Sequence, residues 1–159
     1  MGDACHHHHH DGPPKAADVA RAVAAAGERL SAEGERMTAA RTRVLELLMA
    51  SGEPVKAYDL IARFGEDGQP AKPPTVYRAL EFLERKGLAH RIASISAYVA
   101  CASGDQDHTA AFLICDCCGA TEEVSAPVAE GLDQAARSVG YVIERTTIEA
   151  HGRCPACAA

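Results

Sequence analysis

Cys115-Asp116-Cys117-Cys118 and Cys154-Pro155-Ala156-Cys157 are two CxxC motifs that close the C-terminal third of this 159-residue chain. Each motif forms a tight turn whose two sulfurs can reach one ion, and two such pairs make a closed tetrahedral zinc site. Thirty-five residues separate the motifs, more than the roughly 15–20 of a compact zinc ribbon. We therefore expect a small folded unit between them, with a structural zinc ion bound by Cys115, Cys118, Cys154 and Cys157. Unrelated turns or disulfides are the alternative.

The remaining candidate ligands look like a second metal site of different chemistry, and they are His90, Cys101, His108 and Glu123. Glu122 is adjacent to Glu123, and strands alternate their faces, so only one of the two carboxylates can point at a metal. The spacing to Cys118 favours Glu123.

Composition and charge limit the class of protein. The sequence has no run of 18 or more apolar residues and no apolar segment at its N-terminus, so we expect no membrane span and no secretory signal. A cytoplasmic protein keeps its thiols reduced, which favours ligands over disulfides for the seven cysteines. The net charge is −6, but residues 1–100 hold 13 basic and 13 acidic side chains and residues 101–159 hold 3 and 9. The N-terminal part can therefore approach DNA.

Apolar periodicity and stop signals predict four helices and a hairpin in the N-terminal part. The helices are expected over 16–30, 38–51, 57–64 and 73–86, with Gly87 as the last stop, and the strands over 88–92 and 96–100. Residues 1–15, with five consecutive histidines, are expected to be a disordered tail, and the histidines are either a purification tag or a native metal-binding segment.

The C-terminal part is predicted as a β-β-α-β unit. The expected strands cover 111–114, 121–125 and 141–149, and the expected helix covers 127–139 with Val128, Leu132, Ala135 and Ala136 facing inward. The fold class is therefore α+β. The domains are expected at 16–101 and 108–159, joined by a polar hinge at 102–107.

Three helices followed by a two-stranded hairpin is the order of a winged helix, whose last helix enters the DNA major groove by its N-terminal end. Arginine there can pair with guanine or clamp phosphate, and tyrosine can contact the backbone. Singly, such residues are usually ordinary surface, and only the combined pattern favours DNA. The candidate contacts are Tyr58, Lys72, Thr75, Tyr77, Arg78 and Arg41.

Three segments carry a resemblance to a known family: Lys72-Pro73-Pro74-Thr75-Val76-Tyr77-Arg78-Ala79-Leu80, Phe112-Leu113-Ile114-Cys115 and Ile148-Glu149-Ala150-His151-Gly152. They resemble the recognition-helix and dimerisation-domain signatures of the ferric uptake regulator (Fur) family. Iron-type members usually carry a His-rich run before the first CxxC, where this chain has the single His108. In that difference, and in the thiolate of Cys101, the chain resembles the zinc uptake regulator branch of the family.

The resemblance implies a homodimeric winged-helix repressor that binds operator DNA with zinc as corepressor and represses zinc-uptake genes. It implies two zinc ions per chain, one structural in the four-cysteine site and one regulatory, with His90, Cys101, His108 and Glu123 as the sensing ligands. No membrane and no small-molecule substrate other than the metal ion are expected as partners.

Other classes are weighed against this interpretation. A zinc deaminase needs an HxE…PCxxC arrangement, but His108 is followed by Thr109-Ala110, so we expect no enzyme. An iron-, manganese- or peroxide-sensing regulator of the same family and a zinc-ribbon interaction module without DNA activity stay as alternatives. Cys117 has no family role that can be assigned, and His151 is expected to be a structural histidine rather than a ligand.

Overall fold

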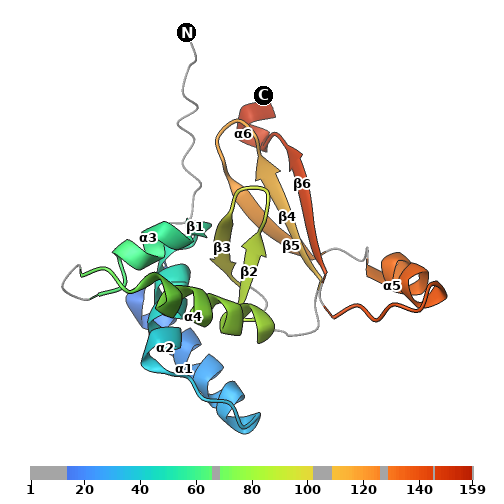
Figure 1. Cartoon of the computed structure of the whole chain (residues 1–159). Helices are drawn as coiled ribbons and strands as arrows, with labels where there is room; N and C mark the ends of the chain where they lie inside the picture. The colour runs from blue at the N-terminus through green and yellow to red at the C-terminus, as the bar shows by residue number, and fades with distance from the viewer. Residues whose placement is uncertain (1–13, 66–68, 102–108, 126–128, 145, 159) are drawn as a thin grey trace. The chain divides into compact units, whose positions relative to one another are not determined.

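The computed structural model describes residues 14–65, 69–101, 109–125, 129–144 and 146–158 (Figure 1). Within these ranges the chain divides into an N-terminal unit, up to residue 101, and a C-terminal unit, from residue 109. The expected hinge at 102–107 and His108 lie outside the described residues, as does nearly all of the expected N-terminal tail. The domain boundaries expected from the sequence therefore stay predictions.

The N-terminal unit contains four helices, α1 (Ala16–Ala32), α2 (Ala39–Ser51), α3 (Ala57–Ala62) and α4 (Pro73–Arg85). Each helix contributes one apolar stripe to a common core, in which Leu30, Val44 and Leu83 are fully buried. The hydroxyl of Thr38 accepts a hydrogen bond from the Arg41 backbone N–H and caps α2, which confirms the predicted start of that helix. The predicted third helix was two residues too long, because α3 ends at Ala62 before Phe64.

The ends of α4 follow from its sequence. Pro73 and Pro74 occupy the first turn, where a missing N–H costs no helical hydrogen bond. At the other end Gly87 has φ +64°, a conformation that suits glycine. The Gly87 N–H donates to the Glu84 carbonyl at 3.1 Å and the Leu88 N–H donates to the Leu83 carbonyl at 2.8 Å. These two bonds form a Schellman motif, so Gly87 is the predicted stop.

A small antiparallel sheet completes this unit, with strands β1 (Val55–Lys56), β2 (Ala89–Ile92) and β3 (Ala97–Ala100) in the order β1-β3-β2. The β2–β3 hairpin confirms the two predicted strands within one residue at each end. Strand β1 was not predicted, because two residues are too short to produce an alternating pattern.

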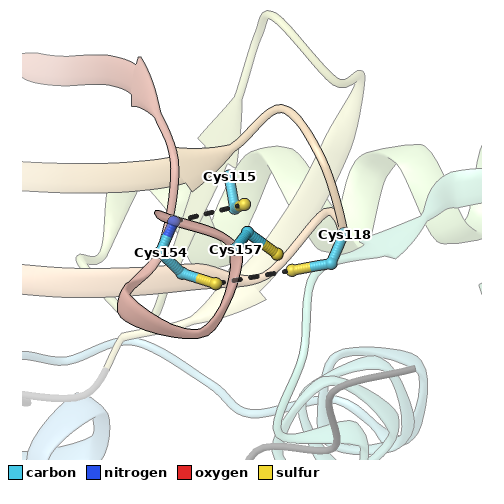
Figure 2. Close-up of side chains that lie close together, drawn as sticks. All are labelled: Cys115, Cys118, Cys154 and Cys157. Carbon is cyan, nitrogen blue, oxygen red and sulfur yellow. Dashed lines mark hydrogen bonds between the residues drawn. The ribbon is translucent and has the colours of Figure 1, made fainter. Parts of the chain in front are cut away.

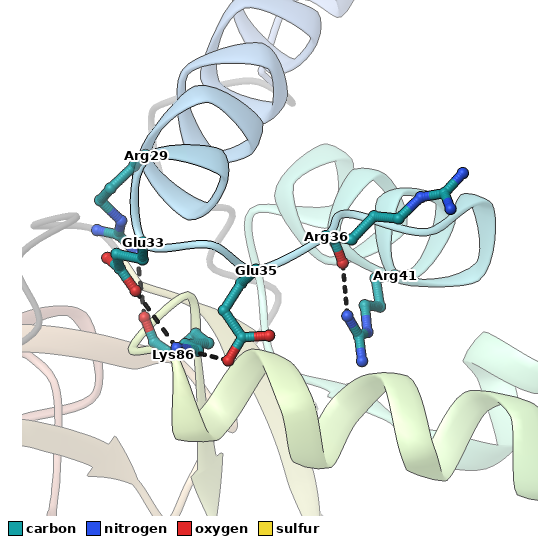
Figure 3. Close-up of polar contacts among 6 residues, drawn as sticks. All are labelled: Arg29, Glu33, Glu35, Arg36, Arg41 and Lys86. Atoms are coloured by element: carbon teal, nitrogen blue, oxygen red, sulfur yellow. Dashed lines mark hydrogen bonds and ion pairs between the residues drawn. The ribbon is translucent and has the colours of Figure 1, made fainter.

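Lys86, which caps the C-terminus of α4, connects that helix to the segment after α1 (Figure 3). Its ammonium lies 3.3 Å from a Glu33 carboxylate oxygen and 2.9 Å from one of Glu35, while its carbonyl accepts a hydrogen bond from Arg29 at 3.0 Å. The hydrogen bond between Lys86 and Glu35 is the largest cause that raises the pKa of Lys86 above 10.5 and lowers the pKa of Glu35 below 4.5. These contacts attach the end of α4 to α1.

The C-terminal unit contains strands β4 (Ala110–Cys115), β5 (Thr121–Ser125) and β6 (Thr147–Gly152), with helices α5 (Ala129–Ser138) and α6 (Pro155–Ala158). The strand order is β5-β4-β6, with β4 antiparallel to β5 and parallel to β6. The two units together confirm the predicted α+β class. Among the described residues, none of the helices combines the length and apolar character that crossing a membrane requires.

The third strand of this unit was misplaced in the prediction. The alternation of Tyr141 to Glu149 suggested a strand over those residues, but β6 begins only at Thr147 and continues to Gly152. Its register explains the difference, because Thr147 pairs with Ala110 and β4 begins at that residue. Within the described part of the chain, β4 therefore has no residue with which the residues before Thr147 could form a strand pair.

Helix α5 confirms the predicted helix but not its buried face. Leu132 is 49% exposed and Ala135 is exposed, although both were expected to face inward, and Val128 lies outside the described residues. The apolar stripe of α5 is therefore largely uncovered in the described part of a single chain.

Candidate metal centre and nucleic-acid interface

The four cysteines of the two CxxC motifs meet because β4 and β6 run parallel. Each motif lies at the C-terminal end of one of these strands, and parallel strands end at the same edge of a sheet. The pairing continues to the last residues, with Cys115 opposite Gly152, and the Asp116 N–H donates to the Gly152 carbonyl at 2.9 Å. Strand β5, helix α5 and strand β6 lie in the long segment between the motifs, as expected from the separation of the motifs.

Local turns orient the four cysteine sulfurs toward one another (Figure 2). In the first motif the Gly119 N–H donates to the Cys115 carbonyl at 2.9 Å and the Cys115 N–H donates to the Ala120 carbonyl at 2.8 Å. Gly119 adopts φ +77°, which closes this turn at low steric cost. In the second motif Cys154 stands before α6, and its carbonyl accepts hydrogen bonds from Cys157 and Ala158, each at 2.9 Å.

The resulting distances fit a tetrahedral zinc site. The four sulfurs of Cys115, Cys118, Cys154 and Cys157 all lie within 4.8 Å of one another, and Cys118 Sγ is 3.8 Å from Cys154 Sγ. Zinc–sulfur bonds of about 2.3 Å in a tetrahedron place the sulfurs about 3.8 Å apart. A disulfide needs about 2.0 Å, and all four residues are free cysteines. The donor set therefore fits zinc and excludes the disulfide alternative.

The thiols of the four-cysteine set differ in the direction of their pKa shifts. The backbone N–H groups of Cys118 and Cys154 donate toward the Cys115 sulfur and lower its pKa to about 6. Burial, then the neighbouring thiols, raise the pKa of Cys157. The Ala120 amide lowers the pKa of Cys118, but burial and the thiols of Cys115 and Cys154 outweigh it, so the pKa is raised. The four adjacent thiols therefore resist being ionised at the same time. A zinc ion, when bound, deprotonates the thiols that ligate it.

Three further residues lie beside this centre. His151 Nδ1 lies 2.9 Å from Asp116 Oδ1, so His151 is engaged with a carboxylate and is not part of the four-sulfur group. Cys117 is exposed and is also outside that group. The sequence indicated a structural role for His151 but did not identify Asp116, although Asp116 follows a ligand directly and was open to the same reasoning.

The candidate ligands of the second site are described in their own units. In the N-terminal unit the Cys101 N–H donates to the Leu88 carbonyl at 3.0 Å, and His90 pairs with Val99. This register puts His90 and Cys101 on one face of the hairpin, with a ring nitrogen and the Cys101 sulfur within 4.8 Å of each other. His90 is buried.

In the C-terminal unit, Glu123 and Glu122 lie on opposite faces of the sheet. Glu123 pairs with Phe112, which is buried, and Glu122 pairs with Leu113, which is half-exposed. Glu123 is itself partly buried, whereas Glu122 is exposed.

The candidate DNA contacts lie mostly on one exposed surface of the N-terminal unit. Tyr77 is 51% exposed, Arg78 and Lys72 are exposed, and Thr75 is partly buried, all in the first turns of α4 or just before it. Tyr58, in the first turn of α3, is 77% exposed. The buried residues of α4 lie on its opposite face, so these side chains are available to a partner.

Arg41 has a different environment. Its guanidinium lies 3.3 Å from the centre of the Phe82 ring and donates to the Arg36 carbonyl (Figure 3). The side chain is partly buried, so its cation packs on α4 within the chain. A contact between Arg41 and DNA stays a prediction.

Comparison with known proteins decides the family. Residues 32–151 match the profile of the ferric uptake regulator family. The chain belongs to this family. A zinc uptake regulation protein of Escherichia coli (strain K12) is 43% identical over 124 residues, which are 77% of this chain and 72% of the relative.

Two solved structures of similar proteins have the same fold. A zinc uptake regulator complexed with zinc and DNA has a TM-score of 0.79 at 39% identity and covers 88% of this chain and 95% of its own. A structure of holo XcZur has a TM-score of 0.76 at 39% identity, over 91% of this chain and 99% of its own. Both solved structures therefore share the fold of this chain.

Proposed function

We propose that this Fur-family protein is a zinc-responsive transcriptional repressor, which binds operator DNA as a zinc-loaded homodimer and represses zinc-uptake genes. The likeness to a regulator complexed with zinc and DNA supports this function most directly. A repressor of this kind acts where the chromosome is, so we place the protein in the cytoplasm. It is a regulator rather than an enzyme.

Two zinc ions per chain are proposed. The four-cysteine set supplies a closed structural site, which leaves no position for a substrate. The regulatory set combines His90, Cys101, His108 and Glu123, and its support comes from the adjacent His90 and Cys101 on the hairpin and from the sheet face that Glu123 shares with Phe112. A thiolate with two imidazoles and one carboxylate suits tetrahedral zinc better than iron or manganese.

The proposed regulatory ligands come from both sides of residues 102–107 in the sequence. His90 and Cys101 belong to the wing hairpin, whereas Glu123 belongs to β5 of the C-terminal unit. A bound zinc ion would supply a cross-link between these two parts of the chain. The ligand side chains would then fix the separation of the two recognition helices in a dimer, which must match half-sites about one helical turn, or a multiple of it, apart.

The proposed DNA surface is the N-terminal end of α4. Arg78 and Tyr77 are exposed candidates there for base and phosphate contacts, and the exposed Lys72 adds a cation. The acidic residues 101–159 carry the whole net charge of −6, so the C-terminal unit is unsuited to contact phosphate.

The proposed homodimer surface belongs to the C-terminal unit. Large apolar side chains are exposed there on β4, on α5 and in the segment after α5, and a contiguous exposed apolar surface marks an interaction site. The uncovered stripe of α5 is accounted for if a second copy covers it. These side chains are Leu113, Leu132, Val139, Tyr141 and Val142.

Selection of genomic DNA tests the function. Purified protein is incubated with fragmented genomic DNA at fixed salt, with buffered zinc, with ferrous iron, or with a chelator too weak to remove the structural metal. We expect palindromic fragments from upstream of metal importers, recovered only with zinc. Recovery only with iron would instead identify an iron sensor, and no specific fragment with any metal would favour an interaction module without DNA activity.

A further inference from the structure

A polar contact joins the two halves of the four-cysteine site without involving any of its sulfurs. Asp116 directly follows the first cysteine of the first motif, and His151 lies on β6, three residues before Cys154. The 2.9 Å contact between His151 Nδ1 and Asp116 Oδ1 therefore links the first CxxC turn to the strand that leads into the second.

Asp116 holds β6 by its backbone as well. Its N–H donates to the Gly152 carbonyl at 2.9 Å, so one residue fixes two consecutive positions of the strand. Among the described strands of this unit, β6 pairs only with β4 and forms an edge of the sheet. The position of the second motif consequently depends on what holds β6 to β4 at this end.

A second backbone contact joins the two motifs. The Cys154 N–H donates to the Cys115 sulfur at 3.3 Å. Helix α6, which begins directly after Cys154 and carries Cys157, is four residues long and has no buried residue. A helix this short is not stable without contacts to the rest of the fold. The approach of Cys154 and Cys157 to the first motif is therefore set mainly by the end of β6.

We propose that Asp116 and His151 are positioning residues for the structural zinc site, which hold the second CxxC turn against the first and thereby slow the release of the metal. The proposal rests on the zinc occupancy of the four-cysteine set given under the proposed function. His151 acts through Asp116 and not as a ligand, because its Nδ1 is engaged with the carboxylate and its ring is outside the four-sulfur group.

The expected effect is moderate. A net intramolecular hydrogen bond changes an equilibrium by about three- to tenfold. Groups bonded directly to a metal-ligating residue change metal affinity by about 10- to 100-fold. The lower range applies here because the Asp116 side chain is 63% exposed and water competes for it.

Zinc release from the full-length protein tests the proposal. A weak chelator first removes loosely bound metal, and transfer of the remaining zinc to a strong chromophoric chelator is then timed. We expect Asp116→Ala and His151→Phe each to accelerate release by about three- to tenfold. We expect the double variant to match the faster single variant, because both changes remove the same contact. Asp18→Ala, which removes an exposed ion pair within α1, is the matched control and should release zinc like the unaltered protein.

Two further measurements separate positioning from other roles. Asp116→Asn keeps an oxygen that can accept a hydrogen bond from a neutral His151, so its release rate should lie nearer to that of the unaltered protein than the rate of Asp116→Ala. It also provides a test if the alanine variant does not fold. In cobalt-loaded protein, His151→Phe should leave the sulfur-to-cobalt charge-transfer bands unchanged.

Three results would each overturn the proposal. The first is zinc release at the unaltered rate in both single variants, and the second is a release rate in the double variant that multiplies the two single effects. The third is a changed cobalt spectrum in His151→Phe. A failure of the four-cysteine zinc site itself has a different signature. The unaltered protein would then retain no zinc after the weak chelator.

Discussion

Replacing Cys154 by serine removes one of the four sulfurs from the four-cysteine centre and should unfold the C-terminal unit. Among the residues of this unit that the structure describes, the buried side chains are few and come from one strand: Ala110, Ala111, Phe112, Ile114 and Cys115. A unit of about 50 residues has a free energy of unfolding of roughly 3–8 kcal/mol, at about 0.05–0.15 kcal/mol per residue. Structural zinc contributes an apparent binding free energy of about 10–16 kcal/mol in small peptides.

The free energy lost with the zinc ligand is therefore comparable to the whole free energy of unfolding of the unit. If four ligands share the free energy of zinc binding equally, one of them accounts for about 2.5–4 kcal/mol, which overlaps the lower end of the range given for the unit. The N-terminal unit has a larger core of its own, so we expect it to stay folded.

Zinc content and hydrogen exchange measured on the same samples test this expectation. Cys154→Ser should lose the structural zinc and lose amide protection over 109–158, while 14–101 keep theirs. Cys117→Ser is the matched control, because Cys117 lies in the same motif as Cys115 and Cys118 but outside the four-sulfur group. It should keep both metal and protection. Full zinc content and unchanged protection in Cys154→Ser would refute the reasoning.

The remaining predictions concern the N-terminal unit. Arg78→Ala should weaken operator binding by about 1–3 kcal/mol with unchanged zinc content, as measured by fluorescence anisotropy beside an Arg21→Ala control; loss of zinc would argue against its assignment to DNA. Cys101→Ser should lower zinc-dependent operator binding while thermal melting shows that the fold survives, and a melting loss equal to that of Cys154→Ser would contradict separate regulatory and structural sites. Lys86→Met should lower the melting temperature of the unit, because it removes the ion pair with Glu35. The pKa of Glu35 is lowered and that of Lys86 is raised, so the difference from the unaltered protein should persist between pH 4.5 and 10.5 and shrink as the pH falls below 4.5 or rises past 10.5. A difference independent of pH would point to packing instead.

Local signals in the sequence were sufficient for most of the N-terminal unit, apart from strand β1 and the end of α3. Thr38, Pro73 and Gly87 act through their own backbone and nearest neighbours, and the structure places them at helix ends as predicted. The four-cysteine set was predictable for a related reason, since the CxxC spacing itself brings two sulfurs to one point.

Features that depend on distant partners were not predictable in the same way. The start of β6 is set by where β4 begins, so the alternation from Tyr141 onward suggested a strand too early. The exposed face of α5 carried an ordinary amphipathic pattern, but the pattern does not say whether the same chain or a second copy covers it. The contact of Arg41 with Phe82 likewise depends on the packing of α2 against α4.

Zinc affinity measured with and without operator DNA tests the central claim most directly. If zinc at the regulatory ligands promotes DNA binding, linkage requires that operator DNA tighten zinc binding by the same factor, typically about 5- to 150-fold. Competition of the full-length protein with a zinc indicator, repeated in saturating operator and in non-operator DNA, gives both affinities. The account predicts that operator DNA tightens zinc binding and that non-operator DNA does not. The factor should equal the one by which zinc tightens operator binding. Equal zinc affinity in both DNAs would contradict it.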